Sequence, residues 1–424
     1  MSGHSVFARQ YTDDDVRFDS RRSPVYGTRG ACSSSQPLAT EAGLQVLRRG
    51  GNAADACVAM AAALNVTEPC STGLGGDAFC LYYDASDKAV RCLLGNGASP
   101  AGLTEDLVRS RGFEGGIPPP NALNVTIPGA AACWCDAVKH FGSGKLALAD
   151  ILEPATELAT NGFAVSPITA HCWQAASHQL IESKTHGGEL LVSDASGELR
   201  APMAGEAFRN PSLARVFDAL ARDGKKGFYS GWIGESIVEA VKSRGGVMEA
   251  SDLLSHRTEV ADPISTTYRG IEVYQVPPPT QGIVALIALN LMEEKAAFNG
   301  KMGYNRQLSH GQMSADRLHI DVECVRRAFA EAVHHVCDPI QFDGSGNDSG
   351  RQRQSDHWHK IRDLLSKKFA RFKVCPPRLP PTPFLPLPSL TLPLIPCPIH
   401  KPLKTSHLFS SSLSGLPLNT GVSP

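Results

Sequence analysis

The stretch that decides the fold class is residues 50–83, GGNAADACVAMAAALNVTEPCSTGLGGDAFCLYY. Asn52 follows two glycines and belongs to a residue type that caps helices, so we expect a helix over residues 53–64. Alanine fills much of this helix, which predicts close packing on a neighbouring layer and a central place in the fold. A glycine-rich turn over residues 71–77 then leads into 78–83, an apolar run with strand composition. Helix, turn and strand in this order predict a mixed α/β (α+β) fold.

The glycine-rich turn invites comparison with a phosphate-binding loop. Such a loop follows a strand and opens a helix, so that backbone N–H groups point at the anion. Here the order is reversed, because the helix comes first and the strand follows the glycines. We therefore expect no nucleotide site, and we interpret the glycines as residues that allow positive φ in a tight turn.

Outward from this stretch, helices and strands continue to alternate up to about residue 340. Apolar positions at helical spacing predict a helix that starts near Pro37 and stops at Gly50, and further helices over 143–159, 231–241 and 316–336. Residues 271–276 read as a strand that Pro277 ends, and Thr280 is expected to cap the helix after it. The apolar face of the helix over 316–336 is expected at Leu318, Val322, Val325, Phe329 and Val333.

Composition restricts the function classes. The 424 residues are 42% hydrophobic, as in a globular protein, and 41 basic side chains nearly balance 42 acidic ones. No global field would draw the chain to nucleic acid or to a membrane surface, so small molecules or proteins are the expected partners. The polar start of the chain lacks the pattern of a signal peptide, and the 12 cysteines sit singly among apolar residues. Both features favour the reducing cytoplasm.

The composition changes along the chain and predicts three segments. Residues 1–340 form the α/β region, 341–373 a polar loop followed by a basic segment, and 374–424 a tail rich in proline, leucine and serine. The tail is apolar enough to suggest a membrane span, but its repeated prolines exclude a transmembrane helix. A disordered or polyproline-like tail is expected instead.

Several strings in the α/β region, taken in order, are similar to the large subunits of γ-glutamyltransferases, in particular to the glutathione-hydrolase-like branch without a signal peptide. The resemblance covers roughly 320 residues and ends after residue 370. The strings are Gly50-Gly51-Asn52-Ala53-Ala54-Asp55-Ala56, Gly73-Leu74-Gly75-Gly76-Asp77, Pro128-Gly129-Ala130, Phe141-Gly142-Ser143-Gly144, Gly227-Phe228-Tyr229-Ser230-Gly231, Tyr268-Arg269-Gly270, Pro277-Pro278-Pro279-Thr280-Gln281-Gly282 and Leu318-His319-Ile320-Asp321-Val322-Glu323.

The resemblance implies an N-terminal-nucleophile hydrolase fold, a four-layer αββα sandwich made as a proenzyme that cuts itself into two subunits. It implies cleavage of γ-glutamyl amide bonds, with glutathione or a related peptide as the small-molecule partner and no cofactor. The nucleophile is the threonine that begins the small subunit, and its own α-amino group, with a pKa of about 8, acts as the base.

The match to the small subunit is missing in this sequence. The nearest counterpart of the catalytic threonine is Thr405, in Lys404-Thr405-Ser406-His407, without the strand that should follow it. We therefore expect an incomplete sandwich that is inactive alone and that associates with a small subunit from another product. The alternative is a non-catalytic fragment or pseudoenzyme that acts as a binding or scaffold protein.

Substrate binding is expected near residue 96. In the family an arginine shortly before a Ser-Pro pair holds the α-carboxylate of the γ-glutamyl group, and here that stretch is Leu93-Leu94-Gly95-Asn96-Gly97-Ala98-Ser99-Pro100. Asn96 and Ala98 are the candidate binding residues, and Arg91 lies slightly upstream. Without the arginine, affinity for the carboxylate should be weaker or should depend on another residue.

Two other chemistries are weighed against this interpretation. His319, Cys324, His334, His335 and Cys337 share one region, but they lack two ligand pairs at zinc spacing, so no metal is expected. A cysteine nucleophile would have to be Cys32, Cys133 or Cys135, and the sequence shows neither a nearby base nor an electropositive setting for these thiols.

Overall fold

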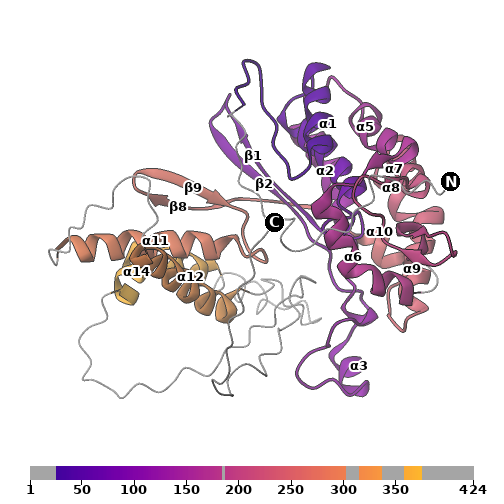
Figure 1. Cartoon of the computed structure of the whole chain (residues 1–424). Helices are drawn as coiled ribbons and strands as arrows, with labels where there is room; N and C mark the ends of the chain where they lie inside the picture. The colour runs from indigo at the N-terminus through magenta and orange to yellow at the C-terminus, as the bar shows by residue number, and fades with distance from the viewer. Residues whose placement is uncertain (1–24, 184–186, 302–314, 337–357, 375–424) are drawn as a thin grey trace, which may run out of the picture.

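A computed structural model describes residues 25–183, 187–301, 315–336 and 358–374 (Figure 1). Helices and short antiparallel strands alternate along these residues, so the predicted mixed fold class is confirmed. The proline-rich tail and Thr405 lie outside the described residues. In the part of the chain that the structure describes, every helix is too short or too polar to cross a bilayer.

The predicted first helices are both present. Helix α1 spans Pro37–Arg48, and α2 spans Ala53–Thr67. The Asn52 side chain accepts hydrogen bonds from the N–H groups of Ala54 (3.0 Å) and Asp55 (3.2 Å), while Asp55 accepts one from the Asn52 N–H (3.0 Å). This reciprocal cap fixes the start of α2. Helix α2 packs against α1, α4 and α5 and is central, as its alanine content predicted.

A three-stranded antiparallel sheet lies beside these helices. Its middle strand β2 (Ala89–Gly95) pairs with β1 (Ala78–Asp84) on one side and with β7 (Glu259–Ala261) on the other. One face of β1 packs on the core with Cys80 and Tyr82, whereas Phe79, Leu81 and Tyr83 on the other face are 43%, 43% and 58% exposed. The sheet is therefore covered by helices on one side and carries an apolar surface on the other, which we call the outer β1 face.

The remaining helices of the first core cluster form a layer at the right of Figure 1. The core of this layer includes Trp173, Phe217 and Leu152, all essentially inaccessible to solvent. Its elements are α4 (Ala130–Phe141), α5 (Leu148–Asn161), α6 (Pro167–Glu182), α7 (Pro211–Asp223), α8 (Lys225–Tyr229), α9 (Gly231–Lys242) and α10 (Ala250–Ser255), with the short strands β3 (Phe163–Ala164), β4 (Val192–Ser193), β5 (Leu199–Arg200) and β6 (Ala207–Phe208). Helix α3 (Glu105–Ser110) has no buried residue and lies apart from this layer, at the bottom of Figure 1.

A second core cluster forms around the hairpin of β8 (Ile264–Tyr268) and β9 (Ile271–Gln275). It contains helix α11 (Gly282–Lys301), helix α12 (Ala315–His335), a helical segment over 358–364 and helix α14 (Lys367–Val374). Ile361, Leu364 and Ala370 are each 1% exposed within this cluster. Residues on both sides of position 340 thus share one core, and the boundary placed there stays a prediction.

Helix α12 is present, and most of its predicted apolar stripe faces outward. Leu318, Val322 and Val333 are 49%, 46% and 57% exposed, whereas Cys324, Ala328 and Ala332 are buried. Small side chains allow α11 and α12 to approach closely, so they form the contact between the two helices. The spacing predicted a helix with these apolar residues on one face, and the structure shows that most of this face is exposed, although Phe329 packs against the second core cluster.

Candidate substrate-binding loop

The loop after β2 lies next to the turn before β1, because the two strands are antiparallel and Ala78 pairs with Gly95. The carboxylate of Asp77 accepts a hydrogen bond from the N–H of Gly97 (3.0 Å), which ties the glycine-rich turn to the loop. Asn96 is half-buried and Ala98 is exposed. The structure thus brings together Asn96, Ala98 and the glycine-rich turn.

A third segment, residues 127–129, closes this arrangement. The N–H of Ile127 donates to the carbonyl of Ala98 (3.0 Å), and the N–H groups of Gly129 and Ala130 both donate to the carbonyl of Gly76 (3.0 Å each). These hydrogen bonds restrict the backbone of the Asn96–Ala98 segment. We call this segment the donor loop, because the γ-glutamyl donor is expected to bind there.

Close backbone approach explains three glycines at this site. A Cβ on Gly97 would lie 1.6 Å from the Ile127 carbonyl oxygen, and a Cβ on Gly129 would lie 2.1 Å from the Gly95 oxygen. A Cβ on Gly95 would lie 2.4 Å from the Cβ of Cys133. All three distances are far below an ordinary van der Waals contact, so glycine is required at each position.

The interpretation of the glycine-rich turn itself is wrong. None of Gly73, Gly75 and Gly76 has a positive φ. An added Cβ on Gly75 would meet nothing within 4 Å, and nothing in the structure explains why glycine stands there. What the turn contributes is a backbone acceptor at Gly76 and the carboxylate of Asp77.

Arg91 lies away from the donor loop. Its guanidinium pairs with Asp87 and lies 3.9 Å from the Asp84 carboxylate, beside the turn that joins β1 to β2. Five residues of extended strand separate Arg91 from Asn96, or about 16 Å. Its hydrogen bond holds the pKa of Asp87 below the ordinary value. The structure does not bring Arg91 together with Asn96 and Ala98.

Two buried residues behind the donor loop were not identified as site residues from the sequence. Tyr229 is 6% exposed; its hydroxyl donates to the Pro128 carbonyl (2.7 Å) and accepts from the Ala132 N–H (3.1 Å). His256 is 9% exposed, and its ring centroid lies 5.5 Å from that of Tyr229. Burial raises the pKa of Tyr229, and burial together with nearby Lys225 lowers the pKa of His256. Tyr229 stands in one of the family-like strings, whereas the sequence gives no signal for His256.

The cysteine candidates are poor nucleophiles in this environment. Burial raises the pKa of the Cys133 and Cys135 thiols to about 12 and also raises that of Cys32. These thiols are therefore protonated at neutral pH, and a protonated thiol is not the reactive form. Among the described side chains, no group of three or more His, Cys, Asp and Glu residues is arranged to hold a metal ion. Cys337, one of the residues considered as metal ligands, lies outside the described residues.

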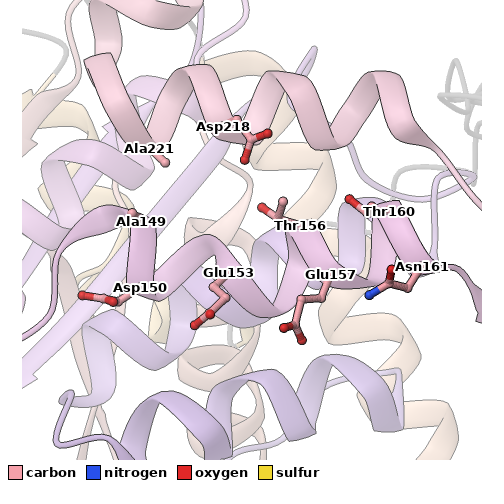
Figure 2. Close-up of a pocket in the computed structure, with 9 residues that line it drawn as sticks. All are labelled: Ala149, Asp150, Glu153, Thr156, Glu157, Thr160, Asn161, Asp218 and Ala221. Atoms are coloured by element: carbon pink, nitrogen blue, oxygen red, sulfur yellow. The ribbon is translucent and has the colours of Figure 1, made fainter.

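A separate cavity of about 420 Å³ lies between α5 and α7 (Figure 2). Acidic side chains dominate it, but two of them are already paired, since Arg49 contacts Asp150 at 2.8 Å and Glu153 at 2.5 Å. The cavity is open to solvent and does not include the donor loop. It therefore adds nothing to the candidate site.

Comparison with known proteins gives this geometry its context. Residues 39–372 match the family model of gamma-glutamyltranspeptidase. A "Glutathione hydrolase-like YwrD proenzyme" of Bacillus subtilis is 34% identical over 327 residues, which are 75% of this chain and 57% of that protein.

The chain is also similar to solved structures. Helicobacter pylori gamma-glutamyltranspeptidase superposes with a TM-score of 0.69 at 26% identity, covering 83% of this chain and 93% of that one. A cephalosporin acylase from Bacillus halodurans gives 0.67 at 32% identity, covering 85% and 63%. The predicted N-terminal-nucleophile hydrolase fold class is thereby confirmed. The chain belongs to the γ-glutamyltranspeptidase family.

Proposed function

We propose that this chain is the donor-binding part of a γ-glutamyltransferase (glutathione hydrolase), which cleaves the γ-glutamyl amide bond of glutathione and related peptides. The family match over residues 39–372 carries the proposal, because it includes both strands and all three backbone segments that build the donor loop. Membership in the family gives the reaction class, and the loop supplies a place for the donor.

The donor loop would bind the γ-glutamyl group through Asn96. The amide nitrogen of Asn96 can donate to a carboxylate oxygen, but an amide is neutral. Charge-assisted hydrogen bonds, such as those from an arginine, are roughly twice as strong. We therefore propose that this site holds the donor carboxylate more weakly than an arginine would.

Covalent chemistry would require a threonine nucleophile outside the matched residues. In the reaction that we propose, the threonine hydroxyl forms an ester with the γ-glutamyl carbonyl and the amine leaves with a proton. Water then releases glutamate, or an amino acid accepts the acyl group. The part of the chain that the structure describes would bind and orient the donor.

The outer β1 face supports a second polypeptide as partner. The chain spans 57% of the length of its Bacillus subtilis relative, and Phe79, Leu81 and Tyr83 present a row of apolar side chains on the open side of the sheet. Apolar surface of this kind marks interaction sites. We propose that a polypeptide equivalent to the remaining part of the relatives packs on this face and provides the threonine, and that residues 1–424 alone are inactive.

Two measurements on the purified chain test these proposals. The chain is incubated with a chromogenic γ-glutamyl anilide and then run on a denaturing gel, and glutathione binding is measured by calorimetry. We expect glutathione binding, a single uncleaved band and no release of the anilide. Turnover with two bands would overturn the proposed inactivity. Absence of glutathione binding would overturn the donor-site proposal and leave the scaffold alternative.

We also propose that the protein works in a reducing compartment such as the cytoplasm. The nine cysteines that the structure describes are outside disulfide bonds. Thiol titration of the denatured chain without reductant should detect all 12 cysteines as thiols. A lower number would indicate disulfides and an oxidising compartment.

A further inference from the structure

Tyr229 caps helix α4 from a distant element. Gly129 stands at the N-cap position of α4 and has no side chain to satisfy the first N–H groups of the helix. The hydroxyl of Tyr229 accepts the N–H of Ala132 (3.1 Å) and donates its own proton to the carbonyl of Pro128 (2.7 Å). A single buried hydroxyl therefore links the helix to the residue before the cap.

Pro128 is in turn coupled to the donor loop through backbone atoms alone. On one side of it, Ile127 bonds to Ala98 and its carbonyl lies against Gly97. On the other side, Gly129 lies against the carbonyl of Gly95. No flexible side chain separates these segments, so a shift of Pro128 would move the donor loop.

His256 holds the Tyr229 ring in place. The two rings lie 5.5 Å apart at 36°, and His256 follows α10 directly. Among the described residues, its buried Nε2 has no hydrogen-bond partner, so ring packing is what it contributes to Tyr229. The same helix contacts the chain three residues after the donor loop, because the Asp252 carboxylate accepts the N–H of Ala101 (3.1 Å).

From this chain of contacts we infer that Tyr229 and His256 are positioning residues, which fix the donor loop and its Asn96 through Pro128. The inference rests on the proposed function, since it concerns the placement of the donor. Neither side chain is placed in contact with the donor. Their effect is on the geometry of the loop that binds it.

The test uses the full chain labelled with ¹⁵N-glycine, and glutathione as the probe. Tyr229→Phe removes the hydroxyl and keeps the ring. We expect it to shift the amide resonances of Gly97 and Gly129 and to weaken glutathione binding several-fold. Tyr83→Phe, which removes an exposed hydroxyl on the outer β1 face, should change neither.

A general loss of stability must be separated from positioning. Phe217→Leu enlarges a fully buried site in α7 and should lower the melting temperature without moving the Gly97 and Gly129 resonances. His256→Ala should shift the Gly97 and Gly129 resonances as Tyr229→Phe does. His256→Phe keeps a ring at this position, so its resonances should stay close to those of the wild-type chain. Unchanged resonances in Tyr229→Phe, or equal shifts in Phe217→Leu, would overturn the inference.

The proposed donor binding and the proposed positioning role of Tyr229 can be disproved independently of each other. If the wild-type chain does not bind glutathione, the donor-site proposal is wrong, while the amide resonances still report whether Tyr229 fixes the loop. If glutathione binds but Tyr229→Phe has wild-type affinity and resonances, the function stands and the positioning role is wrong.

Discussion

At the scale of single residues, the backbone position of the donor loop depends on the lack of a side chain at Gly97. Gly97 has a Cα that faces the Ile127 carbonyl so closely that even a methyl group has no room. Asn96 and Ala98 flank this glycine and take their positions from it. The chemistry of the site therefore depends on a residue that itself offers no functional group.

Gly97→Ala should displace the donor loop. A Cβ at 1.6 Å from a carbonyl oxygen forces the backbone to move. In an enzyme, misplacing a group by about 1 Å can lower the reaction rate by about two orders of magnitude. We expect glutathione affinity to fall by about tenfold or more, measured by calorimetry. Gly75→Ala is the matched control, since its Cβ would meet nothing within 4 Å and binding should be unchanged. Equal effects of both variants would contradict this account of the loop.

Asn96 should be the residue that sets affinity for the donor carboxylate. Asn96→Arg introduces a charged donor, and hydrogen bonds to charged groups contribute about 1 kcal/mol more than neutral ones, so glutathione should bind about fivefold more tightly. Asn96→Ala should weaken binding several-fold. Arg91→Ala is the control, because Arg91 is paired with acidic residues beside the β1–β2 turn. A loss of affinity in Arg91→Ala would instead place the carboxylate near Arg91.

The buried thiols predict a dependence of stability on pH. Cys133 and Cys135 have a pKa of about 12 in the folded chain, against a reference value of 9.0. A pKa that is raised on folding gives stability that is complete below the unfolded value and is lost as pH rises toward the folded one. The urea midpoint should therefore fall between pH 9 and pH 11. In the Cys133→Ala/Cys135→Ala double variant the fall should be shallower, and an unchanged slope would exclude the thiols as its cause.

At the scale of elements, regular patterns in the sequence predicted the existence of helices better than their environment. The capped helix α2, the strand β1 and the glycine stop after α1 all follow from local chemistry and are present. Helix α12 shows the limit, because its large apolar residues and its small buried residues both recur at helical spacing. Which face meets α11 depends on a partner far away in the sequence, and no local rule supplies it.

The same reason explains what sequence analysis found at the site. Asn96 and Ala98 came from a resemblance in one short stretch, and the structure brings these two together. Tyr229 and His256 reach the site from elements more than 100 residues later, and only the packed fold places them there. Local patterns cannot identify such residues.

Asp55 provides a test at this scale. It is 1% exposed, and one carboxylate oxygen accepts the N–H groups of Asn52 (3.0 Å) and Ser143 (3.1 Å), joining the start of α2 to the end of α4. Asp55→Ala leaves two N–H groups unpaired, so we expect a loss of about 2–3 kcal/mol in the free energy of unfolding.

The control for Asp55 is another capping aspartate. Asp150 accepts the N–H of Ala147 (2.9 Å) at the start of α5, but its side chain is 42% exposed, so water can replace it. Asp150→Ala should cost about 1 kcal/mol or less in a urea titration. Similar losses for the two variants would mean that burial of the Asp55 cap is not what matters.

At the scale of the whole molecule, the two open apolar surfaces are the unusual feature. The outer β1 face and the exposed stripe of α12 belong to different core clusters, yet both present large apolar side chains to solvent. Exposed apolar surfaces of this kind mark interaction sites, and we infer that both meet further polypeptide. The molecule should therefore behave as a component of a larger assembly.

The outer β1 face should drive self-association of the isolated chain. Phe79 and Leu81 alternate along an edge strand, and exposed apolar edge strands are sites of unwanted pairing. Replacing both by glutamate should shift the chain from oligomers to monomer in sedimentation velocity at micromolar concentration. Since both side chains are substantially exposed, the urea midpoint should change little.

Ile168→Glu is the matched control for this variant, because Ile168 is 50% exposed but belongs to helix α6 and not to a strand of the sheet. It should leave the association state unchanged. If the complementary polypeptide packs on the outer β1 face, the Phe79→Glu/Leu81→Glu variant should also fail to bind it while Ile168→Glu binds normally. Wild-type association and partner binding in the double variant would move the interface elsewhere, and the α12 stripe would then be the surface to test by Val322→Glu.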